Sequence, residues 1–170
     1  MVDIESVYRE YFPKVYNYVY YRLLDRDRSD DLVSEIFVRI FEKQNRYDAE
    51  KGSVSAWVFR IAHNALVDDF RRKKEVLSIG GDEMDYQPDD CDIQLAVIQS
   101  EERKELYRLL AGMTARERAV LSMKYFADMT NRKIAAELDM NESTVSSVVW
   151  NAMRKLRKGM RAYVGESRYE

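Results

Sequence analysis

Apolar residues recur at helical spacing through the first part of the chain. The pattern predicts helices over 3–24, 29–43 and 53–74. Pro13 should kink or divide the first of these, and Ser29 is placed to cap the second. The positions that we expect on the inner faces are Ile4, Val7, Tyr11, Val15, Tyr18, Leu23, Leu32, Val33, Ile36, Phe37, Ile40, Phe41, Val54, Trp57, Ile61, Ala65 and Val67. Three amphipathic helices of this kind can enclose one small core.

The second part of the chain has the pattern of helices, caps and turns that is typical of a helix-turn-helix. Four helices are predicted, over 93–113, 114–127, 130–138 and 141–158. Thr114 and Glu117 are spaced as a capping box, and Met129 and Ile134 as a hydrophobic staple. Asn141 then precedes the last helix as its cap. A short helix, a tight turn and a capped second helix match a helix-turn-helix.

The segment between these parts, 75–92, breaks the pattern. It contains seven acidic residues and no basic one, so its net charge of −7 contrasts with +1 over 1–74 and +4 over 101–170. We interpret it as an extended linker. The predicted organisation is therefore a domain at 1–74, an acidic linker at 75–92 and a second domain at 93–170.

Composition narrows the class of protein. Six glycines and two prolines leave few turn-forming residues, which favours an all-α fold. The single cysteine, Cys91, excludes an internal disulfide and a cysteine-rich zinc site. The acidic N-terminus is unlike a secretory signal, and no apolar run approaches the ~18 residues of a membrane span. We therefore expect a cytoplasmic protein.

Three stretches resemble, in order, the sigma-70 family of bacterial RNA polymerase initiation factors, in its extracytoplasmic-function (ECF) subgroup. "SDDLVSEIFVRIFE" resembles the family's "AEDLVQEtFlrlw", and "GSVSAWVFRIAHNALVDDFRRKK" its "gsfraWLfrIArNlaiDalRrrr". The stretch from "MTARERAVL" to "NAMRKLRK" is similar to the family's C-terminal helix-turn-helix segment. The likeness covers about 120 of the 170 residues.

The resemblance implies that the helix at 29–43 docks on core RNA polymerase. The residues at the matching positions are Asp30, Asp31, Leu32, Ser34 and Glu35. Acidic residues on this edge suit a basic partner surface, although an ordinary solvated helix face would carry the same charges. Ser34 stands where the family usually has Gln, so this chain has no amide at that docking position.

The helix at 53–74 would recognise the −10 promoter element and hold the melted strand. Its implied contacts are Tyr47, Trp57, Arg60, Asn64, Arg71, Arg72 and Lys73. Aromatic stacking surfaces and a basic track are what a single strand requires. Two alternatives remain open: Trp57 would also suit core packing, and the basic run would also suit a frayed helix end.

The last helix would contact the −35 element. The implied contacts are Ser143, Thr144, Ser146, Ser147, Trp150, Asn151, Arg154, Lys155 and Lys158. Ser146, Val148 and Asn151 stand where relatives usually carry Lys or Arg, so we expect sparse base readout, with Asn151 as the amide able to read an adenine. Trp150 could pack on a thymine methyl or the sugar backbone, or be buried.

The expected partners are core RNA polymerase, promoter DNA and an anti-sigma factor, with no small-molecule substrate and no cofactor or metal. No catalytic arrangement is visible, and His63 suits packing or the surface better than general-base chemistry. The acidic linker would either mimic nucleic acid in a polymerase channel or act as a charged tether. Competing functions are an autonomous helix-turn-helix regulator and a protein-interaction module that has lost DNA reading.

Overall fold

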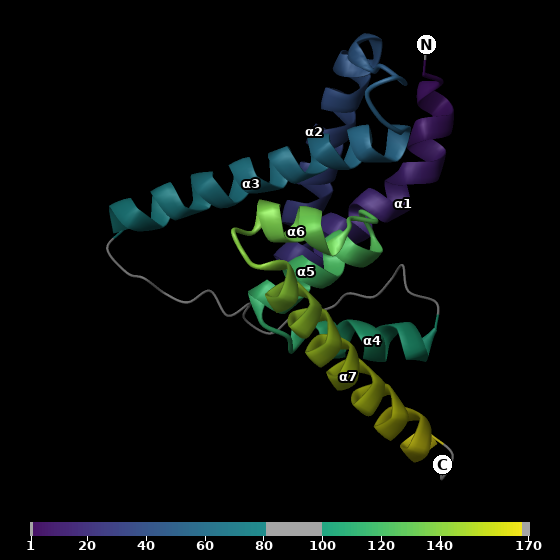
Figure 1. The fold of residues 1–170 in the computed structure, drawn as a ribbon, viewed down its shortest axis with the longest axis vertical. Coiled ribbons are helices and arrows are strands. Elements are labelled where there is room, and N and C mark those ends of the chain that lie inside the picture. The colour runs from purple at the N-terminus through teal and green to yellow at the C-terminus, as the bar shows by residue number, and fades with distance from the viewer. Residues whose placement is uncertain (1, 81–99, 168–170) are drawn as a thin grey trace. The chain divides into compact units, whose positions relative to one another are not determined.

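The computed structural model describes residues 2–80 and 100–167, and all secondary structure in these residues is helical (Figure 1). The predicted all-α fold is therefore confirmed. The chain divides into two compact units between Asp89 and Asp90. The first contains α1 (Ile4–Leu23), α2 (Arg26–Lys43), the short 3₁₀ helix η1 (Gln44–Arg46) and α3 (Val54–Gly80), and the second contains α4 (Glu101–Ala111), α5 (Ala115–Tyr125), α6 (Asn131–Glu137) and α7 (Glu142–Ser167).

Helix α1 is continuous through Pro13, so the proline does not divide it. The Asp3 side chain caps its start by accepting a hydrogen bond from the backbone N–H of Glu5. It ends at Leu23, and the next residue, Leu24, caps it with a left-handed backbone (φ 51°) and donates its N–H to the carbonyl of Tyr20 at 2.7 Å. A proline inside a helix removes one backbone donor, and the burial of one side of α1 compensates for that loss.

Helix α2 begins three residues before the predicted start, because Asp25 caps it and Ser29 does not. The Asp25 carboxylate accepts from the backbone N–H of Arg28 at 3.0 Å. Ser29 is fully buried one turn later, where its hydroxyl donates to the carbonyl of Asp25. Asp and Ser are about equally good caps, so local sequence did not decide between them. Asp30 and Asp31 consequently lie beyond the first turn.

The core of the first unit forms where α3 packs on both α1 and α2 (Figure 1). Its fully buried side chains include Val15, Tyr18, Val19, Val33, Ile36, Val58, Ala62, Ala65 and Leu66. Two predicted core positions are wrong: Val67 lies at the exposed margin of α3, and the Phe41 side chain is 59% exposed. Contact with two helices centres the buried stripe of α3 on Val58, Ala62 and Leu66, which turns Val67 outward.

Helix α3 also continues to Gly80, six residues past its predicted end at Lys74. The remaining linker residues 81–92, Cys91 among them, lie outside the described residues, as do 93–99 of the helix predicted to start at residue 93. The domain boundaries at 74 and 93 stay predictions.

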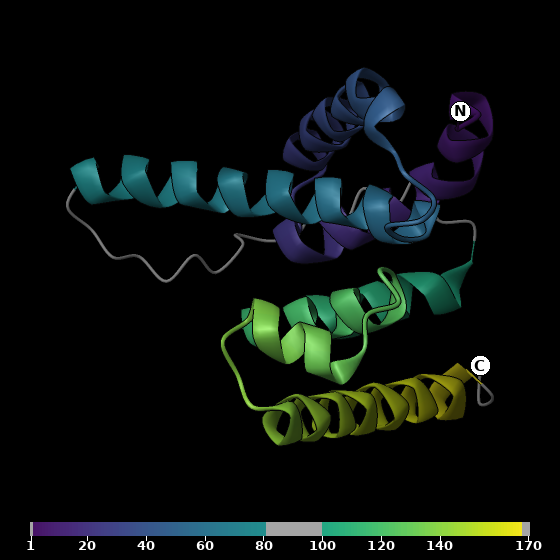
Figure 2. The ribbon, with the colours of Figure 1, turned by 45° about the horizontal axis from the view of Figure 1, so that its top comes forward.

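In the second unit α4, α5 and α6 all pack on the long helix α7 (Figure 2). Val120, Met123, Ile134, Val145 and Ala152 are fully buried there. The predicted inner face of the last helix is confirmed for Val145, Ala152 and Leu156, with Val149 half-buried beside them. Near the other end of α7, Gly159 allows close approach, since a Cβ there would collide with the side chain of Leu109 on α4.

The predicted capping box opens α5. The Thr114 hydroxyl accepts from the N–H of Glu117, and the Glu117 carboxylate accepts from the N–H of Thr114 at 2.9 Å. The other carboxylate oxygen accepts from Lys155 on α7 at 2.5 Å. Burial works to raise the pKa of Glu117, but the hydrogen bonds from Lys155 and Thr114 outweigh it and lower that pKa. This one carboxylate therefore both caps α5 and ties it to α7.

We expect Glu117→Gln to destabilise the second unit by about 1–3 kcal/mol at neutral pH, because it removes a charge-assisted hydrogen bond and weakens a helix cap. Since folding lowers this pKa, the stabilisation is present above the ordinary value of 4.5 and is lost as the pH falls through the folded value. Hydrogen exchange of the α5 amides should therefore show a difference from wild type at pH 7 that shrinks towards pH 4. Glu102→Gln, an exposed acid on α4, is the control, and an equal effect from it would contradict this assignment.

Candidate functional site

The outer side of α3 carries one exposed polar stripe. Arg60, Asn64 and Arg71 are all exposed and follow one another at i, i+4 and i+11. Helical spacing of this kind places them on one face. Three of the predicted −10 contacts are thus brought together on the side of α3 opposite its core face.

A short loop between η1 and α3 is braced by Tyr47. The Tyr47 hydroxyl donates to the carbonyl of Gly52 at 3.1 Å, and its ring lies 5.5 Å from the Trp57 ring, between centroids. Gly52 has φ 154°, a backbone conformation that side-chain-bearing residues rarely adopt. Trp57 is only 8% exposed. The packing alternative thus describes Trp57 in this structure, where its ring supports Tyr47 and the loop.

A buried polar pair ties α1 to α3 behind the stripe. The hydroxyl of Tyr18, which has no exposed surface, lies 3.0 Å from Nδ1 of His63, and His63 is buried as well. The Arg22 side chain also hydrogen bonds to Tyr18, and burial lowers the pKa of Arg22. Since arginine can only donate, the Tyr18 hydroxyl accepts from Arg22, and the direction of its bond with His63 is set by the histidine tautomer. His63 therefore has a packing role next to Asn64, one of the two roles that its sequence allowed.

On α2 the predicted docking residues divide between surface and core. Asp30, Asp31 and Ser34 are exposed, and the Ser34 hydroxyl donates to the carbonyl of Asp30 at 2.8 Å. Leu32 is buried, so it supports this edge from beneath and does not line it. Glu35 is half-buried and faces α3.

Ion pairs join the α2 edge to the basic end of α3. Glu35 pairs with Arg39 on its own helix and with Arg72 on α3, at 3.7 Å. Farther along, Arg28 pairs with Asp69. Lys73 lies close to the same charged groups. Burial lowers the pKa of Lys73 and the nearby Arg28 lowers it further, whereas the carboxylates of Asp25 and Asp69 oppose this change. The basic run is therefore held against acids of α2 and α3, which argues against a frayed helix end.

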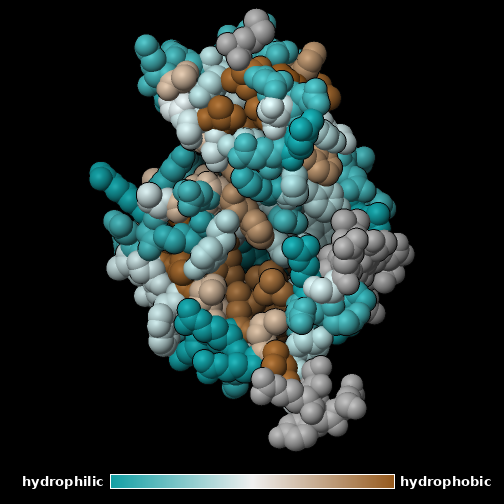
Figure 3. Space-filling view, turned by 90° about the vertical axis from the view of Figure 1, so that its right-hand side faces the viewer, coloured by the Kyte–Doolittle hydropathy of each residue, from teal (hydrophilic) through white to brown (hydrophobic). Residues whose placement is uncertain are grey.

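A shallow apolar groove of about 570 Å³ lies between α1 and α2. It is lined by Ile4, Glu5, Val7, Tyr8, Phe12, Ser34, Phe37, Val38, Ile40 and Phe41. The Tyr8 ring lies 5.1 Å from Phe12 and 5.0 Å from Phe37, between centroids. Val38 (57% exposed) and Phe41 stand out to solvent, and Figure 3 shows brown, apolar surface at this end of the unit.

Sequence reasoning missed this groove because it assigned Phe37 and Phe41 to the core. The available signal was the width of the apolar face on α2, which is greater than one small core can cover. An apolar patch rimmed by polar residues is typical of an interaction surface.

In the second unit the N-terminal turns of α7 carry exposed hydroxyl groups. Ser143, Thr144, Ser146 and Ser147 are all exposed, whereas Val145 between them is buried. The Ser146 hydroxyl donates to the carbonyl of Glu142 at 3.1 Å, and that of Ser147 to the carbonyl of Ser143 at 3.0 Å. With those protons committed, the two serines offer acceptors to a partner and few donors.

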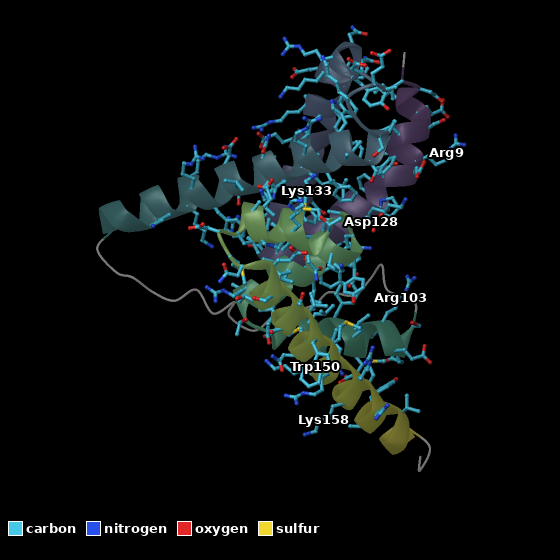
Figure 4. The ribbon with its side chains drawn as sticks, in the orientation of Figure 1. Arg9, Arg103, Asp128, Lys133, Trp150 and Lys158 are labelled. Atoms are coloured by element: carbon cyan, nitrogen blue, oxygen red, sulfur yellow. The ribbon has the colours of Figure 1, made fainter. Side chains whose placement is uncertain are left out.

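Farther along α7, an aromatic ring and several cations share one flank (Figure 4). Trp150 is 62% exposed, so the buried alternative is wrong, and the Arg154 guanidinium lies 4.8 Å from its ring centroid. A groove of about 330 Å³ runs along this flank of α7. It is lined by Trp150, Arg154, Arg157, Lys158 and Arg161. Sequence analysis did not list Arg157 or Arg161, although their spacing from Trp150 could have indicated them.

Two further contacts of the helix-turn-helix were not foreseen. Lys124 on α5 donates to the side-chain oxygen of Asn131 on α6 at 2.7 Å, and the amide nitrogen of Asn131 donates to Ser146 on α7 at 3.0 Å. This chain of hydrogen bonds joins all three helices at the start of α7. Lys133, exposed on α6, adds another cation to the same unit (Figure 4).

Lys155 differs from the other predicted −35 cations because it is already paired with Glu117. Asn151 is half-buried, and Lys158 is exposed. Within the described ranges, no group of three or more His, Cys, Asp and Glu side chains is arranged to hold a metal ion. Among the helices described for 2–80 and 100–167, none has the length and apolar character needed to cross a lipid bilayer.

Comparison with known proteins places both units in one family. The sigma-70 region 2 family model matches residues 7–76, and the sigma-70 region 4 model matches residues 109–158. The chain is 25% identical over 159 residues to the ECF RNA polymerase sigma factor RpoE of Cereibacter sphaeroides, covering 91% of this chain and 84% of that one. It is 26% identical over 162 residues to the ECF RNA polymerase sigma factor SigX of Bacillus subtilis, covering 92% and 82%.

Solved structures agree on the fold. The chain resembles the sigma factor RpoE from a complex with the anti-sigma factor NepR of Bartonella quintana, with a TM-score of 0.63, 18% identity and coverage of 92% of this chain and 96% of that one. It also resembles CnrH from a complex with the cytosolic domain of CnrY, with a TM-score of 0.55, 19% identity and coverage of 94% and 88%. The chain therefore belongs to the sigma-70 family. Within that family it is an ECF sigma factor, a non-enzymatic protein that directs promoter recognition by RNA polymerase.

The two neighbouring lysines of α7 provide a matched test of the cationic flank. We expect Lys158→Gln to weaken binding of the full chain to a 20-base-pair duplex and to reduce the slope of log affinity against log salt by about 1. Lys155→Gln should change that slope much less, because its charge is already paired with Glu117. Fluorescence anisotropy over a salt series measures both, and equal slope changes would show that Lys155 is as available to DNA as Lys158.

Proposed function

We propose that the three surfaces described above divide the work of an ECF sigma factor. The exposed edge of α2 and its neighbouring groove bind core RNA polymerase. The outer stripe of α3 and the Tyr47 loop contact the −10 element, and α7 contacts the −35 element. The observation that carries this assignment is that Arg60, Asn64 and Arg71 share one exposed face of α3, although they are spread over three turns of sequence.

For the −10 element, the stripe supplies chemistry suited to an opened strand. Asn64 offers an amide that can donate to and accept from a base edge, and Arg60 and Arg71 flank it with positive charge for the backbone. The Tyr47 loop adds a half-buried aromatic ring, on which an unstacked base can stack at a gain of about 1–3 kcal/mol. Trp57 holds that ring in place from below.

For polymerase docking, the polar edge and the apolar groove form one continuous surface. Ser34 belongs to both, and Val38 and Phe41 follow it at i+4 and i+7 on the same face of α2. Asp30 and Asp31 would pair with basic residues of the partner while the apolar side chains lose their contact with water. This combination suits an interface with an apolar centre and a charged rim.

For the −35 element, we propose that positioning outweighs base reading. Ser146 and Ser147 direct their protons to the backbone, and Asn151 is the one amide among the predicted −35 contacts. Arg154 and Lys158 reach towards phosphates, which fix orientation and carry no sequence information. DNA shape then supplies part of the specificity.

We further propose that an anti-sigma factor binds this protein in the cytoplasm. One structurally similar sigma factor, RpoE, was solved in a complex with the anti-sigma factor NepR, and the structurally similar CnrH was solved in a complex with the cytosolic domain of CnrY. The exposed groove of α1 and α2 suits an amphipathic helix, which would compete with polymerase for the same apolar side chains.

An autonomous helix-turn-helix regulator is the alternative, and the first unit argues against it. Such a regulator has no use for an exposed docking edge on α2 or for the polar stripe on α3. Reconstitution with core RNA polymerase, followed by genome-wide mapping of transcription start sites, tests the proposal. We expect new starts that share a −35 and −10 pair, and unchanged initiation patterns would refute it.

The proposed docking surface predicts that a charge placed in the apolar groove weakens binding to core RNA polymerase. Val38→Asp should reduce the affinity for core RNA polymerase about tenfold or more, because it places a charge at the apolar centre of the interface. Val164→Asp makes the same change at an exposed position of α7 and serves as the control. Competition binding with labelled core polymerase measures both, and equal affinities for the two variants would exclude the groove from docking.

Sparse readout at −35 makes a prediction about promoter mutants. Swapping single −35 bases should lower transcription only a few-fold, except at a base read by Asn151, where Asn151→Ala should remove the discrimination of about 1–3 kcal/mol. In vitro transcription from a set of −35 variants tests this. A steep loss at several positions that Asn151→Ala leaves unchanged would contradict it.

A further inference from the structure

An alternating chain of five charges crosses from α3 to α2 and back. It runs Arg72–Glu35–Arg39–Asp68–Arg71, with the two oxygens of each carboxylate paired to different arginines. Arg72 lies 3.7 Å from Glu35, Arg39 lies 3.7 Å from Asp68, and Asp68 lies 3.9 Å from Arg71. Arg39 and Glu35 form the remaining pair, within α2.

The members of this chain belong to two different surfaces. Glu35 lies on the docking edge of α2, whereas Arg71 and Arg72 belong to the basic track proposed for the −10 strand. Arg39 is among neither the predicted docking residues nor the predicted −10 contacts. Of the three arginines linked by these ion pairs it is the least exposed, at 29% side-chain exposure. The Glu35 carboxylate is therefore shared between Arg39 on its own helix and Arg72, one of the predicted −10 contacts.

We propose that Glu35 couples polymerase docking to DNA binding, with Arg39 as the positioning residue that keeps Glu35 beside Arg72. In the free protein Glu35 neutralises part of the charge of Arg72. When a basic surface of polymerase pairs with Glu35, Arg72 is released for the phosphate backbone. The inference rests on the proposed docking and −10 surfaces and adds a link between them.

The expected size of this coupling follows from the solvent exposure of the Arg72–Glu35 pair. Arg72 and Glu35 are 60% and 38% exposed, so their pair is of the weak, solvent-screened kind. An interaction of that strength shifts an affinity by about two- to fivefold and fades as salt rises. Coupling between two binding events is also reciprocal, so whatever factor docking adds to DNA affinity, DNA must add to docking.

A double-mutant cycle on the full chain tests the link, with a labelled single-stranded dT12 oligonucleotide as the probe and anisotropy at low salt as the readout. Glu35→Gln should tighten binding about two- to fivefold. Glu42→Gln removes the same charge from α2, where it has no ion pair among the described residues, and should have a smaller effect. In an Arg72→Gln background, the extra effect of Glu35→Gln should vanish. Equal effects of the two glutamate variants, or an extra effect that persists without Arg72, would overturn the proposal.

A second arm uses core RNA polymerase without DNA. Arg72→Gln should tighten core binding by the same factor, because Glu35 is then free, and it should have no effect in a Glu35→Gln background. If the effects of Arg72→Gln and Glu35→Gln on core binding are additive, the coupling is refuted but the docking surface is not. Failure of the wild-type chain to bind core polymerase would instead refute the proposed docking surface, so the two outcomes are distinguishable.

Discussion

Burial of a wide face of α3 against α1 and α2 is the constraint on which the first unit depends. Val58, Ala62 and Leu66 have no exposed surface, and each large apolar side chain buried in this way contributes about 1.5–3 kcal/mol. Small side chains at Ala62 and Ala65 let the helices approach closely. Once this face is fixed, the helical repeat leaves no freedom for the opposite one, so Arg60 and Asn64 must point outward. The position of the polar stripe is thus a consequence of core packing.

The charges between α2 and α3 have a different role from that core. Arg28 and Asp69 form the more buried of these pairs. The Glu35–Arg72 and Arg39–Asp68 pairs are partly exposed, and each is worth about 1 kcal/mol or less, so these two do not hold the helices together. Weak pairs can, however, exchange partners at little cost. That property suits the roles proposed for Glu35 and Arg72, and it makes the ion pairs at the α2–α3 margin sensitive to salt.

In the second unit one helix serves both stability and recognition. Val145, Ala152 and Leu156 bury one side of α7, and Lys155 is drawn towards α5 by Glu117. The other side is left with exposed serines, then Trp150 and a run of cations. Because Ser146 and Ser147 donate to their own backbone, the surface offers charge and shape more than base-specific donors. This is consistent with a protein that relies on polymerase and a second DNA-contacting unit for its specificity.

Periodicity and capping chemistry were enough to predict seven helices, the capping box at Thr114 and the helix-turn-helix, because these depend on residues within one or two turns of each other. The family motifs likewise predicted functional residues by position, and these assignments stay predictions. The sequence did not show that Asp25, and not Ser29, caps α2, since both are good caps and only packing buried Ser29. Nor could it show that Phe41 is exposed, that Trp57 supports Tyr47, or that Glu35 meets Arg72. Each of these depends on which helix lies alongside another, and that is decided only when the chain packs in three dimensions.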